Sequence, residues 1–346
     1  MLMKNIVLIC GFLVNNSRGR LDYNSECKDA IRHIGLPRIW KDDSNSSHPL
    51  KYFYSIEFQF SIANKEQEND EKVLNTGWYS TVHSPMLSCL DQESPQLADI
   101  IRESLLRNGS TDNYRLFRPL EYHLKNPEQV PLEVDQIVFQ GKLKDGFFIE
   151  AGAHNFEYFS DSLYFELNHG WKGLLVEPHP GNYKEGMSKN RKVSSINTCL
   201  SPLPRVSTIP FSLNRPGVLL VDDETENTGL SLQCYPLFSI LQAMGNPTVN
   251  YFSLDIEGGE FQVLKTIPWD KVDIQVLSVE THFAGLRSEG SRDDIIEYMK
   301  SVGYQYLQWG HQVTTTIQYK DGSQGDYDLV NDLFVKNGIP VINIYQ

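Results

Sequence analysis

The sequence predicts an α/β protein, with a mostly parallel sheet, helices on both faces and an N-terminal extension. From residue 145 onward, short apolar runs alternate with stretches of helical periodicity. Strands that alternate with helices need crossover connections, which favour a parallel sheet. The chain of 346 residues is 40% hydrophobic and 22% charged. This composition indicates a globular protein and excludes a long disordered chain, a collagen-like repeat or a polytopic membrane protein.

The elements of this region follow from apolar periodicity and from their flanking residues. We expect strands at 147–151, 173–177, 193–200, 208–213, 251–255, 275–280, 304–308 and 329–335. We expect helices at 160–169, 181–189, 236–244, 260–266 and 292–302. The parallel strands that start at Phe147, Gly173 and Tyr251 should lie side by side, so that Gly152, Glu177 and Asp255 meet at one edge of the sheet.

The part before residue 145 has a different pattern. Apolar residues at every second position over 52–62, and a second run over 73–82, predict an aromatic β-hairpin in an extension at 20–91. A helix is expected from Ser94, because Leu97, Ile100, Ile101 and Leu105 recur at helical spacing. Prolines at 119, 127 and 131 indicate a loop-rich segment over 110–140.

The first nineteen residues have the pattern of a secretory signal peptide. A basic start, an apolar run over 6–14 and small residues at Ser17 and Gly19 indicate cleavage before Arg20. The alternative to a signal peptide is that the apolar run over 6–14 forms a buried first strand. The run is shorter than the ~20 apolar residues that span a bilayer, so we expect no stable membrane span. A cleaved signal implies the lumen of the endoplasmic reticulum or Golgi, or secretion, with Asn45 and Asn108 as candidate glycosylation sites.

The cysteines that would remain after cleavage are Cys27, Cys89, Cys199 and Cys234. An even number is compatible with disulfides in a secretory lumen, while four unpaired thiols are the alternative. Their spacing matches no zinc pattern, in which pairs stand two to four residues apart. No metal site is predicted.

The net charge of −13 bears on the partners. Binding to nucleic acid needs a basic face that neutralises phosphates. We therefore expect no nucleic-acid partner.

Three of the predicted strands end in residues that can bind a ligand. These ends are Glu150-Ala151-Gly152, then Glu177, and then Asp255-Ile256-Glu257-Gly258-Gly259. Ligands of open parallel sheets bind beyond the carboxyl ends of the strands, and an acid some 20 residues after a glycine turn is placed to bind a ribose diol. No Gly-Lys-Ser/Thr loop follows a strand, which disfavours a P-loop nucleotidase. The pattern therefore favours a nucleoside ligand.

Two stretches, GFFIEAGAHNFEYFSDSLYFELNHGWKGLLVEPHPGNY from Gly146 and YFSLDIEGGEFQVLKTIPWDKVDI from Tyr251, together with the closing DLVNDLFVKN, resemble the FkbM-type methyltransferase family. The similarity is greatest to its Star-like animal branch, and it spans about residues 92–337, leaving 338–346 as a tail. The resemblance implies a Rossmann-like methyltransferase fold with S-adenosylmethionine (SAM) as methyl donor. By position it implies a cofactor site formed by the following residues: Glu150, Gly152, Ala153, Asn155, Glu177 and Asp255. Asp255 and Glu257 match the family's Asp-x-Glu-Gly motif beside the substrate.

The chain departs from the family at the turn after the first strand. Members usually have a second glycine where Phe156 stands, and an acid where Asn155 stands. If this position needs a positive φ, or lies against the methionine end of the cofactor, phenylalanine either strains the turn or fills the pocket. An active site therefore requires the Phe156 ring to point away.

Methyl transfer to a hydroxyl needs aligned reactants and a base near neutral pKa. Asp255 and Glu257, together with His282, are the candidate catalytic residues, and Glu280 could complete the cluster. The alternative is that Glu257 or Glu260 only caps a helix. Two functions remain open: an O-methyltransferase acting on a small molecule or glycan, or an inactive Star-like factor that binds a protein client in vesicle-mediated transport.

Overall fold

The computed structural model describes residues 85–210, 231–285, 289–307, 312–318 and 324–342, and the side chains of 312–318 and 324–330 are left out of this description. The predicted signal peptide, Asn45, Cys27 and the aromatic hairpin at 52–82 lie outside the described residues. Two units are distinguished. The described part of the first unit is the 3₁₀ turn η2 (Pro85–Cys89). All the other described residues belong to the second, larger unit.

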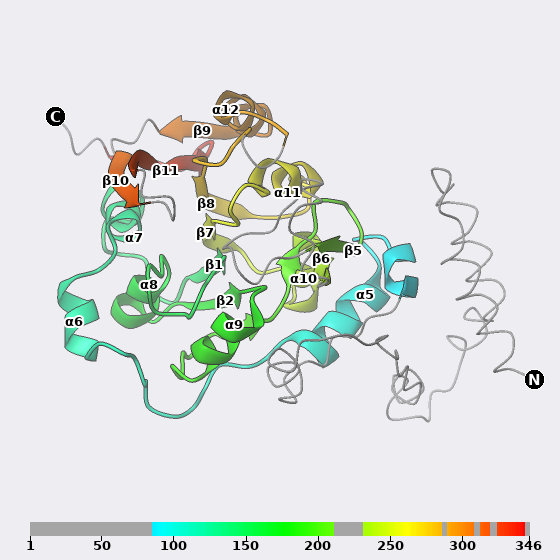
Figure 1. Cartoon of the computed structure of the whole chain (residues 1–346), viewed down its shortest axis with the longest axis horizontal. Coiled ribbons are helices and arrows are strands. Elements are labelled where there is room, and N and C mark those ends of the chain that lie inside the picture. The colour runs from blue at the N-terminus through cyan, green and yellow to red at the C-terminus, as the bar shows by residue number, and fades with distance from the viewer. Residues whose placement is uncertain (1–84, 211–230, 286–288, 308–311, 319–323, 343–346) are drawn as a thin grey trace, which may run out of the picture. The chain divides into compact units, whose positions relative to one another are not determined.

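The large unit is built on one sheet with the strand order β10-β11-β8-β7-β1-β2-β3, in which β9 also pairs with β11 (Figure 1). Its strands are β1 (Phe147–Ala151), β2 (Lys172–Val176), β3 (Ser194–Ile196), β7 (Val249–Leu254), β8 (Ile274–Glu280), β9 (Tyr304–Leu307), β10 (Gln312–Gln318) and β11 (Gln324–Lys336). The pairs β1–β2, β2–β3, β1–β7 and β7–β8 are parallel, whereas β11 runs antiparallel to β8, β9 and β10. This is a Rossmann-like α/β fold, with a mostly parallel sheet and one antiparallel strand, β11, beside β8.

Helices connect the parallel strands: α8 (Leu163–His169), α9 (Pro180–Met187), α10 (Leu237–Ala243), α11 (Glu260–Thr266) and α12 (Arg292–Ser301). The chain runs from β1 through β2 to β3 toward one edge, and from β7 to β8 toward the other. Because such crossovers are right-handed, the two sets of helices cover opposite faces of the sheet. The point where the chain changes direction, between β1 and β7, is the place where ligands bind in folds of this kind.

The core is formed where these layers meet. Phe148, Phe165, Trp171 and Tyr251 are almost completely buried, and the Phe165 and Trp171 rings stack with their centroids 4.2 Å apart. Near-continuous burial along β1, β2 and β7 is typical of a sheet covered on both faces.

Segments before the sheet also form helices. They are α5 (Pro95–Ile100), continued by the π-helical turn η3 (Ile101–Leu105), then α6 (Leu120–Lys125), α7 (Gln129–Val134) and a second π-helical turn, η4 (Asp135–Phe139). The prediction of a helix from Ser94 is confirmed, but the prediction of a loop-rich 110–140 segment is wrong. Pro119 precedes α6 and Pro131 lies in the first turn of α7, where a missing backbone N–H costs no helical hydrogen bond.

A small second sheet has the order β4-β6-β5 (Cys199–Leu200, Ser231–Tyr235 and Ser207–Pro210). Cys199 and Cys234 are opposite each other in its parallel pair and form a disulfide. Cys89 is also disulfide-bonded. The alternative of unpaired thiols is therefore wrong for these three cysteines.

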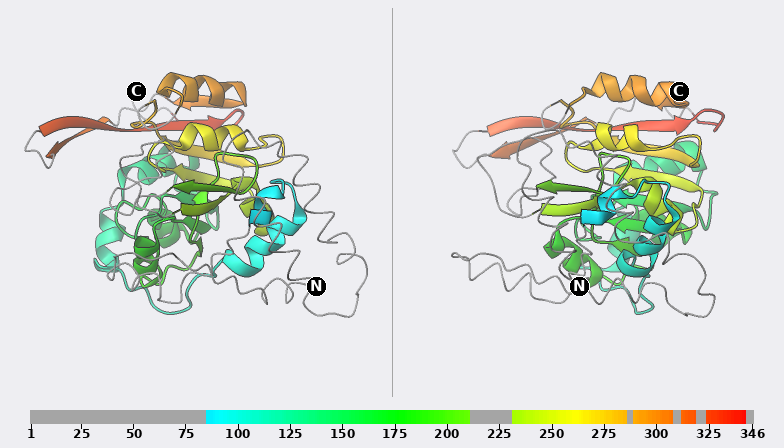
Figure 2. Two further views of the ribbon diagram at one scale, coloured as in Figure 1. Left: turned by 45° about the vertical axis from the view of Figure 1, so that its right-hand side comes forward. Right: turned by 90° about the vertical axis from the view of Figure 1, so that its right-hand side faces the viewer.

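The hairpin formed by β10 and the first half of β11 projects beyond the rest of the sheet (Figure 2). The sequence predicted a strand only at 329–335, which is the half of β11 that pairs with β8 and β9. No helix among the described residues has the length and apolar character needed to cross a membrane.

Candidate functional site

The carboxyl ends of β1, β2 and β7 lie side by side, as predicted. Ala151 pairs with both Val176 and Leu254, so the residues that follow these strands emerge at one edge. Gly152 has φ +90°, and a Cβ atom there would collide with the carbonyl oxygen of Asp255. Only glycine allows this approach, and it brings the ends of β1 and β7 together.

Glu150 is buried on β1 and receives three hydrogen bonds. The Ser160 hydroxyl donates to Oε2 at 2.9 Å, the Asp161 backbone N–H donates to Oε1 at 3.0 Å, and the Ser162 hydroxyl also donates to Oε2. The Arg191 guanidinium donates in turn to both serine hydroxyls, at 3.2 and 3.0 Å. Burial raises the pKa of Glu150, while the Arg191 charge and the serine hydroxyls act to lower it.

Arg191 also holds the turn between β1 and α8. Its Nη1 donates to the Phe156 carbonyl oxygen at 2.7 Å, and its Nε donates to Glu166 Oε2 at 2.5 Å. Both members of this ion pair are buried. Because each guanidinium nitrogen has an acceptor, Arg191 fixes the backbone of the turn as well as the Glu150 cluster.

Glu177 follows β2 and is buried. It accepts the His154 backbone N–H at 2.8 Å on Oε2 and the His179 backbone N–H at 2.7 Å on Oε1. Its carboxylate thus joins the turn after β1 to the start of α9, with lone pairs remaining on both oxygens. Burial raises its pKa to about 8, and the nearby Asp255 and Glu150 charges act in the same direction, against these two hydrogen bonds.

Asp255 follows β7 and lies against Glu280 at the end of β8. Solvent reaches Asp255 at the mouth of the site, while Glu280 is buried. The pKa of Glu280 is raised to about 11 by burial, by the Asp255 charge and by a hydrogen bond with the Asp255 carboxyl. Burial also raises the pKa of Asp255. The groups that act most strongly on this pair include no basic side chain.

Two further acids complete the cluster. Glu260 accepts the backbone N–H groups of Ile256 and Gly258 at 2.9 and 3.0 Å, and so shapes the loop after β7. Burial raises its pKa to about 7. The Ser253 hydroxyl donates to Asp161 at 2.7 Å, and burial together with the Glu150 charge raises the pKa of Asp161 to about 8. An edge this rich in buried carboxyls favours a cationic ligand.

The structure explains how the turn tolerates Phe156. Its backbone has φ +66°, the conformation in which the family has glycine. Its ring is 1% exposed and packs in the core against Tyr183, with centroids 5.6 Å apart, and against Gly186 of α9. The strain predicted for this residue is therefore present, but the ring fills the core and leaves the edge of the sheet open.

The remaining predicted site residues have different surroundings. Ala153 is buried in the core. The Asn155 amide accepts the backbone N–H groups of Glu157 and Tyr158 and donates to Glu185, so this side chain is occupied in holding the turn. Glu257 has φ +64° and is half-buried beside the cluster, where its charge raises the pKa of Glu280.

His282 lies two residues after Glu280 and is half-buried, with its ring edge-to-face against Phe283 at 4.5 Å. Among the residues that the structure describes, no group of three His, Cys, Asp or Glu side chains is arranged to hold a metal ion.

Sequence reasoning missed Ser160, Asp161, Ser162 and Arg191. The first three were assigned to a helix over 160–169, but α8 begins only at Leu163. The run Ser-Asp-Ser before an apolar helix was an available signal, because such side chains hydrogen-bond local groups at helix starts. Arg191 carried no signal, since its partners lie 25 to 35 positions away.

One family model matches the part of the chain that contains this edge. Residues 150–306 match the Methyltransferase FkbM domain. No curated protein matches the chain. Solved structures with a similar fold include a precorrin-6y C5,15-methyltransferase from Geobacter metallireducens, at 11% identity and a TM-score of 0.33, over 66% of this chain and 97% of that one.

Two other similar structures also bear the names of methylating proteins. A putative rRNA-methylase from Clostridium thermocellum has 8% identity and a TM-score of 0.30, over 60% of this chain and 94% of that one. The human methyltransferase 10 domain containing protein has 13% identity and a TM-score of 0.27, over 71% of this chain and 98% of that one.

Proposed function

We propose that this protein binds SAM at the edge formed by β1, β2 and β7 and transfers its methyl group to a hydroxyl acceptor, because residues 150–306 match the Methyltransferase FkbM domain. The observation that carries the proposal is the cluster of buried carboxyls with raised pKa around Asp255, Glu177 and Glu280. SAM carries a sulfonium and an ammonium, and both cations are stabilised by carboxylates.

The residues present fit this cofactor. Gly152 lets the ends of β1 and β7 meet, which brings Glu177 and Asp255 to one edge, and Glu280 Oε2 is buried without a donor group among the described residues. We assign the ribose hydroxyls to Glu177, and the methionine end to the side of the site near Glu150 and Asp255. When bound, SAM supplies an electrophilic methyl group on its sulfonium.

SAM held at this edge would supply the methyl group to the acceptor oxygen, and its sulfur would leave with the electron pair of the carbon–sulfur bond. The hydroxyl proton passes to the protein. Asp255 is the base that the geometry favours, because it is an exposed residue at the end of β7 and its pKa is raised above the ordinary value of a carboxyl group. Glu257 and His282 remain candidates for orienting the acceptor.

We also propose the setting in which this chemistry takes place. A signal peptide at 1–19 would deliver a domain of residues 92–337 to the secretory lumen, where a small molecule or a glycan would be the acceptor. The exposed position of Asn108 supports glycosylation there. The alternative is the Star-like role, an inactive factor that binds a secretory client protein.

The deciding experiment is SAM binding by calorimetry to the purified protein. We expect micromolar affinity, and we expect Glu177→Ala to weaken it by roughly 1.5–3 kcal/mol, or about 10- to 150-fold, as a charge-assisted hydrogen bond is lost. Glu297→Ala is the matched control, because this glutamate is exposed on α12. A folded protein that fails to bind SAM would refute the enzymatic proposal and favour the client-binding alternative.

A further inference from the structure

Asp161 bridges β1 and β7 near the carboxyl ends of these two strands. Glu150 of β1 and Ser253 of β7 are opposite each other in the register of the pair. The Asp161 backbone N–H donates to Glu150 at 3.0 Å, and its carboxyl oxygen Oδ2 accepts the Ser253 hydroxyl at 2.7 Å. Asp161 therefore lies at the place where the chain changes direction across the sheet, which is where open parallel sheets bind their ligands.

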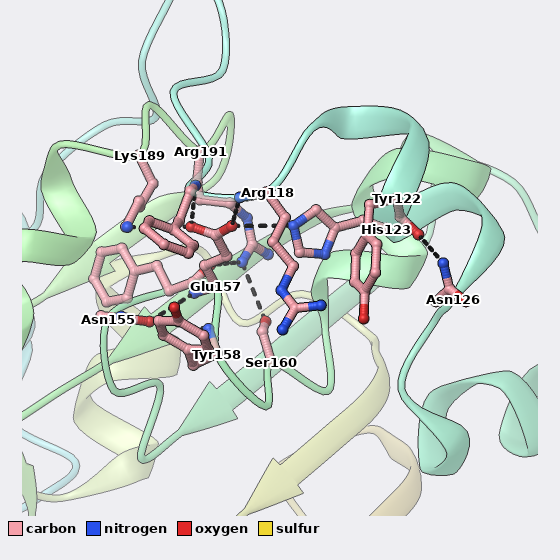
Figure 3. Close-up of polar contacts among 12 residues, drawn as sticks. Arg118, Tyr122, His123, Asn126, Asn155, Glu157, Tyr158, Ser160, Lys189 and Arg191 are labelled. Carbon is pink, nitrogen blue, oxygen red and sulfur yellow. Dashed lines mark hydrogen bonds and ion pairs between the residues drawn. The ribbon is translucent and has the colours of Figure 1, made fainter.

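Glu150, the neighbouring acid, is already compensated from within the chain. Its buried carboxylate accepts the hydroxyls of Ser160 and Ser162 and the backbone N–H of Asp161. Arg191 donates in turn to both serine hydroxyls, and Figure 3 shows its guanidinium against Ser160. The Arg191 charge also opposes the rise in the pKa of Glu150 that burial causes. A cationic ligand would therefore add little to the stability of this carboxylate.

The Asn155 side chain is also engaged. Its Oδ1 accepts the backbone N–H groups of Glu157 and Tyr158 at 3.2 and 2.9 Å (Figure 3), and its Nδ2 donates to Glu185 at 2.9 Å. The sequence predicted that Glu150 and Asn155 both bind the cofactor. Neither of them offers a carboxylate that still needs a positive charge.

Asp161 has the opposite electrostatic surroundings. Among the described residues, its carboxyl has a donor only at Oδ2, the Ser253 hydroxyl, and Oδ1 has none. The side chain is half-buried. Burial and the Glu150 charge raise its pKa to about 8, and the charges of Asp255 and Glu128 act in the same direction. A carboxyl that lies among other acids is stabilised as a carboxylate when a ligand brings a cation to it.

We propose that Asp161 binds the ammonium group at the methionine end of SAM. The inference rests on the proposed function and deepens it, because it assigns the residue that recognises the amino-acid part of the cofactor. An ammonium group has three N–H donors, and Asp161 Oδ1 can accept one of them while Ser253 holds Oδ2. The other acids of the edge have different tasks, Glu177 with the ribose and Asp255 beside Glu280.

This assignment makes Asp161 a specificity residue of the cofactor site. It should favour ligands that carry the amino-acid part over ligands that end at the sulfur, because only the former bring an ammonium to its carboxylate. Two compounds that share adenosine and the sulfur test this directly: S-adenosylhomocysteine carries the ammonium, and 5′-methylthioadenosine carries none.

The experiment is calorimetry of both compounds with the full chain at about pH 8.5, where a carboxyl with a pKa of about 8 is mostly ionised. Asp161→Asn should weaken S-adenosylhomocysteine binding about 10- to 150-fold, as a charge-assisted hydrogen bond is lost, and should change 5′-methylthioadenosine binding by less than about twofold. Asparagine keeps the shape of the side chain, and its amide oxygen can still accept the Ser253 hydroxyl. Retained 5′-methylthioadenosine binding therefore also shows that the variant is folded.

Asp293→Asn is the matched control, because Asp293 is an exposed acid in the first turn of α12, outside the site. It should leave both affinities unchanged. If Asp161→Asn weakened the two compounds equally, or neither of them, the assignment of Asp161 would be overturned while SAM binding at this edge would stand. If the folded, unmodified chain bound neither compound, the proposed function would be refuted, and this inference with it.

Discussion

Two groups of carboxyl side chains lie near the same edge of the sheet, and they differ in what balances their charge. Glu157 and Glu166 have cationic partners: Lys189 lies 3.1 Å from Glu157 and Arg191 lies 2.5 Å from Glu166. Asp255 and Glu280 have chiefly each other, and their pKa values are raised. The balanced group stabilises the fold, whereas the unbalanced group costs stability unless a cation is supplied.

This difference distinguishes the carboxylates that hold the fold from those that form the candidate site. A buried charge without a partner is expensive, and such groups are retained most often where a ligand or reaction needs them. The balanced group holds the turns in place, and the unbalanced group is the part that a cationic cofactor would complete.

The largest effect is expected from removing the cation of the balanced group. Arg191→Met should lower the free energy of unfolding by about 3–5 kcal/mol, because it leaves the buried Glu166 unpaired and removes donors to Phe156 and the serines. Lys300→Met, which breaks an exposed pair with Glu297, should cost under ~1 kcal/mol. Urea denaturation measures both, and equal effects would contradict the distinction.

Phe156→Gly should destabilise by a net ~2–4 kcal/mol. Loss of the buried ring costs about 3–5 kcal/mol, and relief of the positive φ returns roughly 1 kcal/mol. Phe159→Gly is the control, because this residue has a similar φ with an exposed ring, and its stability should stay within about 1 kcal/mol of the unmodified protein. SAM affinity should not increase in Phe156→Gly. Tighter SAM binding would show that the ring obstructs the cofactor.

The pH dependence of unfolding should differ in sign between the two groups. The raised pKa of Glu280, about 11, means that the folded protein holds a proton that the unfolded chain loses above pH ~4.5. The contribution of Glu280 to the free energy of unfolding therefore declines as pH rises from about 5 to 8, by up to ~1.4 kcal/mol per pH unit. Glu280→Gln should make the decline less steep by that amount, and Glu177, Asp161 and Glu260, whose pKa values are also raised, should account for the rest.

Glu157 provides the opposite case. Its lowered pKa means that its stabilising contribution is present above pH ~4.5 and is lost as pH falls through the folded pKa. Glu157→Gln should destabilise the protein at neutral pH and lose less stability on acidification. Denaturation curves at several pH values give the pH dependence of the free energy of unfolding for each variant. If Glu280 and Glu157 contributed slopes of the same sign, the predicted difference between the two groups would be contradicted.

The smallest effect concerns the pH dependence of SAM binding. With a pKa of about 8, Glu177 is largely protonated at pH 6 and cannot accept hydrogen bonds from a ribose with both oxygens. Affinity should rise from pH 6 to 8, by at most about tenfold per pH unit. In calorimetry, Glu177→Gln should make SAM affinity depend less on pH between pH 6 and 8. An unchanged pH dependence would mean that another group titrates.

Much of the sheet could be predicted from sequence, because it depends on local patterns. The β1 strand over 147–151 and the α11 helix over 260–266 have the bounds that were predicted, and β8 and α12 differ from prediction by one residue at one end. Buried parallel strands read as short apolar runs, and the acids and glycine at their ends identify the edge where ligands bind.

The partners of the acids could not be predicted in this way. Sequence alone identified Glu150, Glu177 and Asp255 and their common edge. Only the tertiary structure decided that Arg191 compensates Glu150, that Asp255 raises the pKa of Glu280, and that the Phe156 ring turns into the core. The reason is physical: periodicity and strand ends are properties of neighbouring residues, whereas pKa values and ring packing depend on side chains that folding brings together across tens of positions.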